Sequence, residues 1–164
     1  MNINWFPGHM RKAANQIVEK LDLIDLCCEI VDARIPYSSS NKMLEELTNS
    51  KPRLIILNKE DMASPEETKK WISKLSGSGK RAIALNSKNN CDTKMIYKEA
   101  YKLIKEKMEK RKEKGIQNQE IRMLVFGIPN SGKSTFINQL AKKRSAKVGN
   151  RPGITTAQQW IKTS

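Results

Sequence analysis

The chain has 164 residues and a formal net charge of +14 at pH 7, because 31 Lys and Arg stand against 17 Asp and Glu. This length suits one domain with a core of its own, and no apolar run approaches the roughly 20 residues of a membrane-spanning helix. The N-terminus lacks a basic region followed by an apolar stretch, so no secretory signal is expected. These features predict a globular protein of the cytoplasm with no membrane partner.

The basic excess favours polyanionic partners, nucleic acid first. The alternative is a lysine-rich surface that has no specific partner. The cysteines Cys27, Cys28 and Cys91 are an odd count, and the first two lie in an apolar run. They are therefore expected to be reduced core residues, which agrees with a cytoplasmic location.

The first half of the chain is expected to alternate helices with strands. Pro7-Gly8 is a turn signal, and apolar residues at helical spacing then predict an amphipathic helix over 11–23. Apolar runs predict strands at 26–31 and 53–57, with a short helix at 42–48 between them. Ser64, Pro65 and Glu67 combine an N-cap, a proline at the first helical position and a capping-box glutamate, so a helix is expected to follow through about residue 75.

The second half continues the alternation. A strand is predicted at 81–85, a long helix from about 93 to 114, a strand at 122–126 and a helix over 135–141. A final strand is expected at 158–163, after a loop. Such alternation is typical of an α/β fold, a mostly parallel sheet with helices on both faces. In these sheets the ligand lies at the carboxyl ends of the strands, so the loops after Asp32, Leu57, Leu85 and Phe126 are expected to converge.

A phosphate loop follows the strand predicted at 122–126. Residues 127–134 read Gly-Ile-Pro-Asn-Ser-Gly-Lys-Ser, which fits G-x-x-x-x-G-K-[ST] between a strand and a helix. The glycines let the backbone approach a polyphosphate, Lys133 reaches the β- and γ-phosphates, and the Ser134 hydroxyl ligates Mg²⁺. The alternative is a chance glycine-rich turn, which Lys133 and Ser134 disfavour. The predicted nucleotide-binding residues here are Pro129, Asn130, Ser131, Gly132, Lys133, Ser134 and Thr135.

A guanine-recognition motif, Asn58-Lys59-Glu60-Asp61, follows the strand predicted at 53–57. The Asp61 carboxylate can accept from both N1–H and the exocyclic amino group of guanine, a pair of donors that adenine lacks. Asn58 is expected to brace the site, and the stem of Lys59 to lie over the base. The turn Asn86-Ser87-Lys88 resembles the Ser-Ala-Lys turn whose backbone N–H contacts guanine O6, and the match is clearest for the backbone of Ser87.

The order of these motifs is unusual, because the base motifs precede the phosphate loop. That order resembles the circularly permuted GTPases. The chain looks closely like the YlqF/RbgA-type ribosome-assembly GTPases over its whole length, above all in Trp5-Phe6-Pro7-Gly8-His9-Met10, Asp32-Ala33-Arg34-Ile35-Pro36 and Pro152-Gly153-Ile154-Thr155. The resemblance implies a P-loop NTPase three-layer fold in a circularly permuted Ras-like topology, with GTP or GDP and Mg²⁺ as cofactors.

The resemblance also implies roles for two residues outside these motifs. Thr155 would be the switch threonine that ligates Mg²⁺ with Ser134 and closes over the γ-phosphate, with Thr156 as the adjacent alternative. His9 would be catalytic and would orient the attacking water, although a lone histidine after a turn is more often a surface residue. The implied function is GTP hydrolysis that switches binding to ribosomal RNA or a precursor of the large ribosomal subunit, by a protein expected to be a monomer.

One departure from the family concerns the segment after Thr155. The family carries an Asp-x-Pro-Gly motif there, whereas no acidic residue follows Glu120 in this chain. Residues 1–164 are thus expected to be a permuted GTP-binding domain without its second switch, its last strand and the family's helical RNA-binding domain. Two alternatives stay open, a basic RNA-binding module that binds guanine nucleotide without turnover and a small-molecule phosphotransferase, which the base motif disfavours. Asp32 is the nearby acid that could substitute for the missing aspartate.

Overall fold

The computed structural model describes residues 8–89, 91–117, 120–128 and 130–142, apart from the side chains of residues 8–10, 13, 141 and 142. Within these residues no helix is both long and apolar enough to cross a membrane. The strand expected at 158–163 lies outside the described residues.

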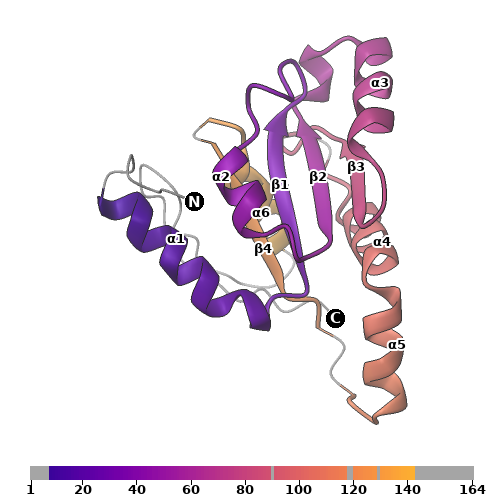
Figure 1. Cartoon of the computed structure of the whole chain (residues 1–164). Coiled ribbons are helices and arrows are strands. Elements are labelled where there is room, and N and C mark those ends of the chain that lie inside the picture. Colours follow the sequence, from indigo (N-terminus) through magenta and orange to yellow (C-terminus); the bar gives the residue numbers. More distant parts are fainter. Residues whose placement is uncertain (1–7, 90, 118–119, 129, 143–164) are drawn as a thin grey trace.

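A four-stranded sheet forms the centre of the fold (Figure 1). Its strands are β1 (Leu26–Asp32), β2 (Arg53–Asn58), β3 (Lys80–Ala84) and β4 (Met123–Gly127), in the order β3-β2-β1-β4. All neighbouring strands are parallel. Each strand lies within one residue of its expected bounds, because continuous apolar runs bounded by turn residues are typical of strands buried on both faces. The phosphate-loop strand β4 pairs with β1.

Helices cover both faces of the sheet (Figure 1). They are α1 (Gly8–Lys20), α2 (Lys42–Leu47), α3 (Pro65–Leu75), α4 (Thr93–Leu103), α5 (Lys105–Glu113) and α6 (Lys133–Lys142), with 3₁₀ turns η1 (Leu21–Leu23) and η2 (Glu60–Met62). On one face, Ile96, Met108 and Phe136 from α4, α5 and α6 pack against the sheet in the largest core cluster. On the other face, α1 and α2 pack beside Phe126, and α3 packs beside Leu57. The result is the expected three-layer α/β fold.

The helices differ from expectation at three places. The first begins at Gly8 rather than residue 11, and its last turn is the 3₁₀ turn η1. The single helix expected over 93–114 is interrupted at Ile104, whose N–H donates to Tyr101 O at 3.1 Å in a tighter turn, while its side chain stays buried. The last described helix, α6, already begins at Lys133, because Phe136 N–H donates to Gly132 O at 2.9 Å. Apolar periodicity locates helical faces better than helical ends.

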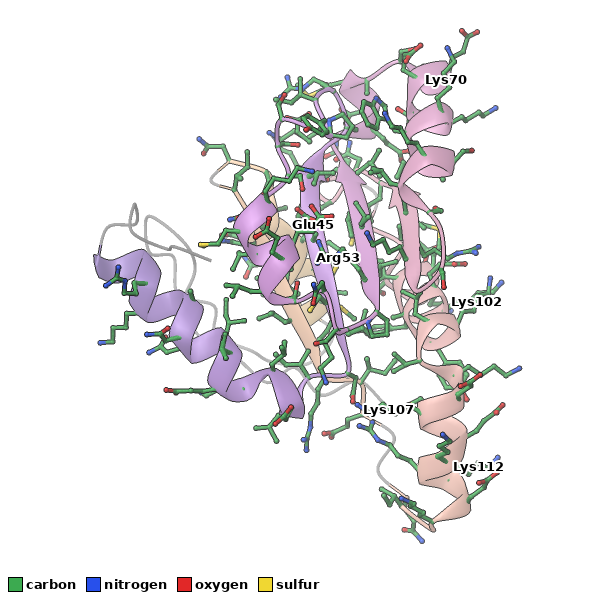
Figure 2. The ribbon with its side chains drawn as sticks, viewed as in Figure 1. Glu45, Arg53, Lys70, Lys102, Lys107 and Lys112 are labelled. Carbon is green, nitrogen blue, oxygen red and sulfur yellow. The ribbon has the colours of Figure 1, made fainter. Side chains whose placement is uncertain are left out.

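A buried ion pair fastens α2 over the sheet. Arg53, at the start of β2, lies 3.2 Å from the carboxylate of Glu29 on β1, and both side chains are 3% exposed. The same guanidinium donates at 2.9 Å to Glu45 O and to Thr48 Oγ1 at the end of α2 (Figure 2). Glu29 also accepts from Asn41 N at 3.0 Å. The pair therefore fixes both α2 and the loop that leads from β1 to it.

A second buried carboxylate fixes the segment that enters the phosphate-loop strand. Asp25 accepts from Lys107 Nζ at 2.8 Å and from Arg111 Nη2 at 2.5 Å, both on α5 (Figure 2). It also accepts from Arg122 N at 2.8 Å, just before β4. Burial raises the pKa of Asp25, but these hydrogen bonds and cations outweigh it and leave the pKa below its usual range. The strand that carries the phosphate loop is thus anchored to α5 and β1 at its amino end.

Candidate nucleotide-binding site

Asn58 joins three loops at the carboxyl edge of the sheet. It ends β2, and its side chain is buried. Its Nδ2 donates to Ser131 O in the phosphate loop at 2.9 Å, and its Oδ1 accepts from Ser87 N at 2.9 Å. The base loop, the phosphate loop and the turn after β3 therefore meet at one amide, as expected for a site at the ends of parallel strands.

Two glycines of the phosphate loop are required by close contacts. Gly132 has a φ of +89°, and a Cβ there would lie 2.0 Å from Asn58 Nδ2. A Cβ on Gly127 would lie 2.7 Å from Ile30 O on β1 and 2.8 Å from Ser131 Oγ. Any side chain at these positions would displace the Asn58 brace or separate β4 from β1. The loop is therefore packed directly onto the neighbouring strands.

Lys133, the lysine of the phosphate loop, is buried at the first position of α6. Its Nζ lies 3.5 Å from Gly127 O, at the limit of a hydrogen bond, and desolvation lowers the pKa of its ammonium group. The nearby Ser131 hydroxyl is buried and has no hydrogen-bond partner in the described part of the chain. A desolvated cation and an unsatisfied hydroxyl beside the start of a helix fit an anion such as a polyphosphate.

Lys59 connects the base loop to the phosphate loop by a second contact. Its Nζ donates to Asn130 O at 2.7 Å and lies 3.6 Å from the Asp32 carboxylate. That carboxylate also binds Arg34, whose Nη2 lies 2.7 Å away. Lys59 has a left-handed backbone with φ of 61°. The sequence predicted a role for Lys59 on the base, whereas its contacts with Asp32 and Asn130 were not predicted.

The remaining base-motif residues lie around the same edge. Asp61 lies on the 3₁₀ turn η2 and is exposed, which leaves its carboxylate accessible to a ligand. Asn86 Oδ1 accepts from Lys88 N at 3.1 Å and so shapes the turn after β3. The N–H of Ser87 donates to Asn58 in this structure, so Ser87 belongs to the brace, and its role toward guanine O6 stays a prediction.

The predicted Mg²⁺ ligands are only partly described. Ser134, the second residue of α6, is partly buried, and Thr135 beside it is exposed. Thr155, Pro129 and the side chain of His9 lie outside the described residues; the backbone of His9 is in the first turn of α1. No group of three or more His, Cys, Asp or Glu that could hold a metal occurs in the described part. Among the predicted ligands, the Ser134 hydroxyl is the described oxygen donor, and an oxygen at the start of α6 is of the type that Mg²⁺ accepts beside a phosphate group.

Comparison with known proteins supports this arrangement. Residues 122–164 match the family described as "50S ribosome-binding GTPase". The chain is 54% identical over 162 residues to ribosome biogenesis GTPase A of Bacillus cereus, covering 99% of this chain and 55% of that protein. It is 35% identical over 159 residues to ribosome biogenesis GTPase A of Thermotoga maritima, covering 97% of this chain and 53% of that protein.

Solved structures agree with the sequence relatives. The crystal structure of GNP-bound YlqF from T. maritima matches with a TM-score of 0.58 and 32% identity, over 82% of this chain and 49% of that one. A GDP-bound structure of TM YlqF matches with a TM-score of 0.56 and 32% identity, over 79% of this chain and 49% of that one. The chain spans about half the length of the relatives it matches. The resemblance predicted from the sequence is confirmed: over nearly its whole length, this chain is a relative of the ribosome biogenesis GTPase A proteins, the YlqF/RbgA-type GTPases.

Proposed function

We propose that the chain is the guanine-nucleotide-binding part of a cytoplasmic GTPase that acts in assembly of the large ribosomal subunit. The observation that carries the proposal is the Asn58 brace, which joins the guanine-recognition loop to the phosphate loop at 2.9 Å. A nucleotide needs both loops at once, and this contact sets their separation before any ligand binds. The GDP- and GNP-bound states of the structural relatives support the same ligand class.

Each group at the site has a part in nucleotide binding. The N–H groups at the start of α6 and the Lys133 ammonium would hold the β- and γ-phosphates, and Asp61 would accept from the guanine edge. Mg²⁺, held by Ser134 and Thr155 with phosphate oxygens, would offset charge that develops during phosphoryl transfer. We assign Thr155 to closure over the γ-phosphate and His9 to orientation of the attacking water.

A second candidate is an RNA-binding module that holds guanine nucleotide without turning it over. The excess of 31 Lys and Arg over 17 Asp and Glu favours it, because a strongly basic chain suits a nucleic-acid partner whether or not it hydrolyses nucleotide. Both candidates predict nucleotide binding, and they differ in turnover. GTP hydrolysis measured with and without large-subunit particles separates them: multiple turnovers support the GTPase, and binding without turnover supports the module.

Ribosomal RNA is the partner that the charge favours. Lys94, Lys98 and Lys102 are exposed on α4 at intervals of four residues, so they share one face of the helix, and Tyr101, next to Lys102 in the sequence, is also exposed. Figure 2 shows Lys102 on this helix. A row of ammonium groups beside an aromatic ring suits a phosphate backbone and unstacked bases.

Binding to ribosomal RNA should fall steeply with salt, and a Lys94→Glu, Lys98→Glu variant should bind more weakly. Binding that ignores salt, or that the variant leaves unchanged, would exclude this face. The basic set Lys142, Lys143, Arg144, Lys147 and Arg151 offers a second candidate, outside the described side chains.

A competition titration tests the ligand class itself. Wild-type protein with Mg²⁺ should bind GDP and GTP well above ATP, because only guanine offers two donors to Asp61. Equal affinity for ATP and GTP would contradict the proposed function at its first step.

A further inference from the structure

Two strained residues of the site contact each other. Lys59 and Asn130, with φ of 61° and 63°, are the two residues other than glycine with a positive φ in the described part of the chain. Lys59 Nζ donates to Asn130 O at 2.7 Å. Such backbone conformations persist only where the surroundings enforce them, and they gather at ligand sites. The contact thus joins a strained point of the base loop to one of the phosphate loop.

The Asp32 carboxylate faces the ammonium group that makes this contact. Asp32 ends β1 directly beside Asn58 in the sheet register, and it is 6% exposed. Its Oδ2 lies 3.6 Å from Lys59 Nζ. An anion at this distance favours the position in which the ammonium also reaches Asn130, because both attractions act on one group.

Arg34 holds the Asp32 carboxylate in place. Its backbone N and its Nε donate to Oδ1 at 2.9 and 3.0 Å, and Nη2 donates to Oδ2 at 2.7 Å. These hydrogen bonds are the main reason that the pKa of Asp32 falls to about 2. Arg34 also lies within the field of Asp61, since the charge of Asp61 is a lesser cause, after Asp32, of the raised pKa of Arg34. The guanidinium therefore binds the carboxylate that faces Lys59 and also interacts, at longer range, with the carboxylate assigned to guanine.

The turn that carries Asp32 and Arg34 is fixed by further hydrogen bonds. Asp32 N donates to Ser39 Oγ at 2.8 Å, and Ser39 Oγ donates to Ile35 O at 2.8 Å. Ala33 N donates to Asn58 O at 2.8 Å, which ties the turn to the base loop. Glu29 holds the far end of the same loop through Ser40 Oγ at 2.8 Å. The direction of the Asp32 carboxylate is therefore set by the fold rather than by a ligand.

We propose that Asp32 and Arg34 are positioning residues for guanine nucleotide, which act by holding Lys59 across the base loop and the phosphate loop. The inference rests on the proposed function. With Lys59 held, its stem is placed for the base, and its ammonium stays on Asn130 O instead of competing with Lys133 for the phosphates. Holding these groups before binding lowers the ordering cost that the nucleotide must otherwise meet.

A double-mutant cycle on GDP affinity tests this proposal. Asp32→Asn keeps the side-chain shape but removes the charge, and GDP affinity should fall about tenfold, as for loss of one charge-assisted contact. Lys59→Met should weaken GDP binding as well. In the Lys59→Met background, the Asp32→Asn change should cost less than about twofold, because its target is gone. Glu67→Gln, a carboxylate-to-amide change on an exposed ion pair, is the matched control and should leave GDP affinity unchanged.

The outcomes separate positioning from general structural support. If Asp32 were purely structural, Asp32→Asn would lower GDP affinity by the same factor in the wild-type background and in the Lys59→Met background. That result would overturn the proposal, as would unchanged affinity in Asp32→Asn. If Asp32→Asn fails to fold, Arg34→Gln replaces it, because the Arg34 side chain is 43% exposed and its loss leaves the core intact. Arg34→Gln should show the same dependence on Lys59. If the wild type itself binds no guanine nucleotide, the proposed function is contradicted, and the positioning role that rests on it is contradicted as well.

Discussion

The amide of Asn58 lies so close to Gly132 that a single added carbon cannot fit between them: a Cβ on Gly132 would be 2.0 Å from Asn58 Nδ2. Asn58 Nδ2 is itself held by its bond to Ser131 O. The base-recognition loop and the phosphate loop therefore pack directly against each other. A substitution in either loop should alter the conformation of both.

A Gly132→Ala change should abolish GDP binding and lower stability. The positive φ of +89° costs about 1–2 kcal/mol for a side chain, and the contact with Asn58 adds to it. Gly79→Ala is the control, because Gly79 has φ of +69° and nothing within 4 Å of an added Cβ. Both variants should lose stability in urea titrations, but Gly79→Ala should keep its GDP affinity. Retained GDP binding in Gly132→Ala would mean that the two loops can separate without loss.

Asn58→Asp should uncouple the loops while keeping the size of the side chain. The change removes the donor to Ser131 O and places a negative charge beside that carbonyl, which should cost about 1–3 kcal/mol of the free energy of unfolding. GDP affinity should fall further than stability alone explains. Asn49→Asp, on an exposed site after α2, is the control and should change neither quantity. Calorimetric titration measures GDP affinity, and urea unfolding measures stability. If Asn58→Asp and Asn49→Asp behave alike in both, the Asn58 side chain does not couple the two loops.

Lys133→Met should make the nucleotide-free protein more stable but unable to respond to GDP. Desolvation lowers the pKa of Lys133 from 10.5, so burial of its charge destabilises the fold at neutral pH. Below the lowered pKa of the folded state, the buried ammonium destabilises the fold fully. As the pH rises through that pKa toward 10.5, the destabilisation disappears, so wild-type stability should approach that of Lys133→Met in alkaline buffer. Thermal melts with and without GDP and Mg²⁺ are the measurement. Wild type should gain about 2.7 kcal/mol at a GDP concentration of about 100 times Kd. A Lys133→Met protein that GDP stabilises as fully as wild type would show the phosphate site to be elsewhere.

Ser134→Ala should remove the Mg²⁺-dependent part of nucleotide affinity. The Ser134 hydroxyl is the Mg²⁺ ligand that we propose among the described residues. Wild type should therefore bind GDP more tightly with Mg²⁺ than with EDTA. The Ser134→Ala variant should bind GDP with the same affinity in Mg²⁺ and in EDTA. Ser73→Ala, on the exposed side of α3, is the control and should keep the Mg²⁺ effect. An undiminished Mg²⁺ effect in Ser134→Ala would assign the metal to other residues.

The sequence predicted the four described strands, their parallel arrangement and the convergence of the loops, because apolar runs and turn residues carry that information locally. It predicted the brace by Asn58, since the motif fixes the residue type at a strand end. It did not predict that Asp32 and Arg34 would face Lys59, because their meeting depends on which strands are neighbours. Nor did apolar periodicity indicate the buried pair of Glu29, inside β1, and Arg53, the first residue of β2, because the two charges meet only in the folded sheet.

The break at Ile104 shows the same limit at the level of a helix. The residues before and after it continue one apolar stripe, so the pattern predicts a single helix over 93–114. In the structure the backbone tightens at Ile104, whose N–H donates to Tyr101 O, while Ile104 and Met108 both stay in the core. Local patterns thus identify which residues are buried, while the sheet against which they pack decides how the backbone bends.

Base specificity of the Asp61→Asn variant is the measurement that tests the account most directly. The amide of Asn donates where the Asp61 carboxylate accepts, and the C2 carbonyl of xanthine accepts where the amino group of guanine donates. Wild type should bind GDP above XDP and ADP, and Asp61→Asn should bind XDP above GDP, with the phosphate loop and the Asn58 brace unchanged. If Asp61→Asn keeps its preference for GDP, or if neither protein distinguishes the three nucleotides, then Asp61 does not read the base and the site is not a guanine site.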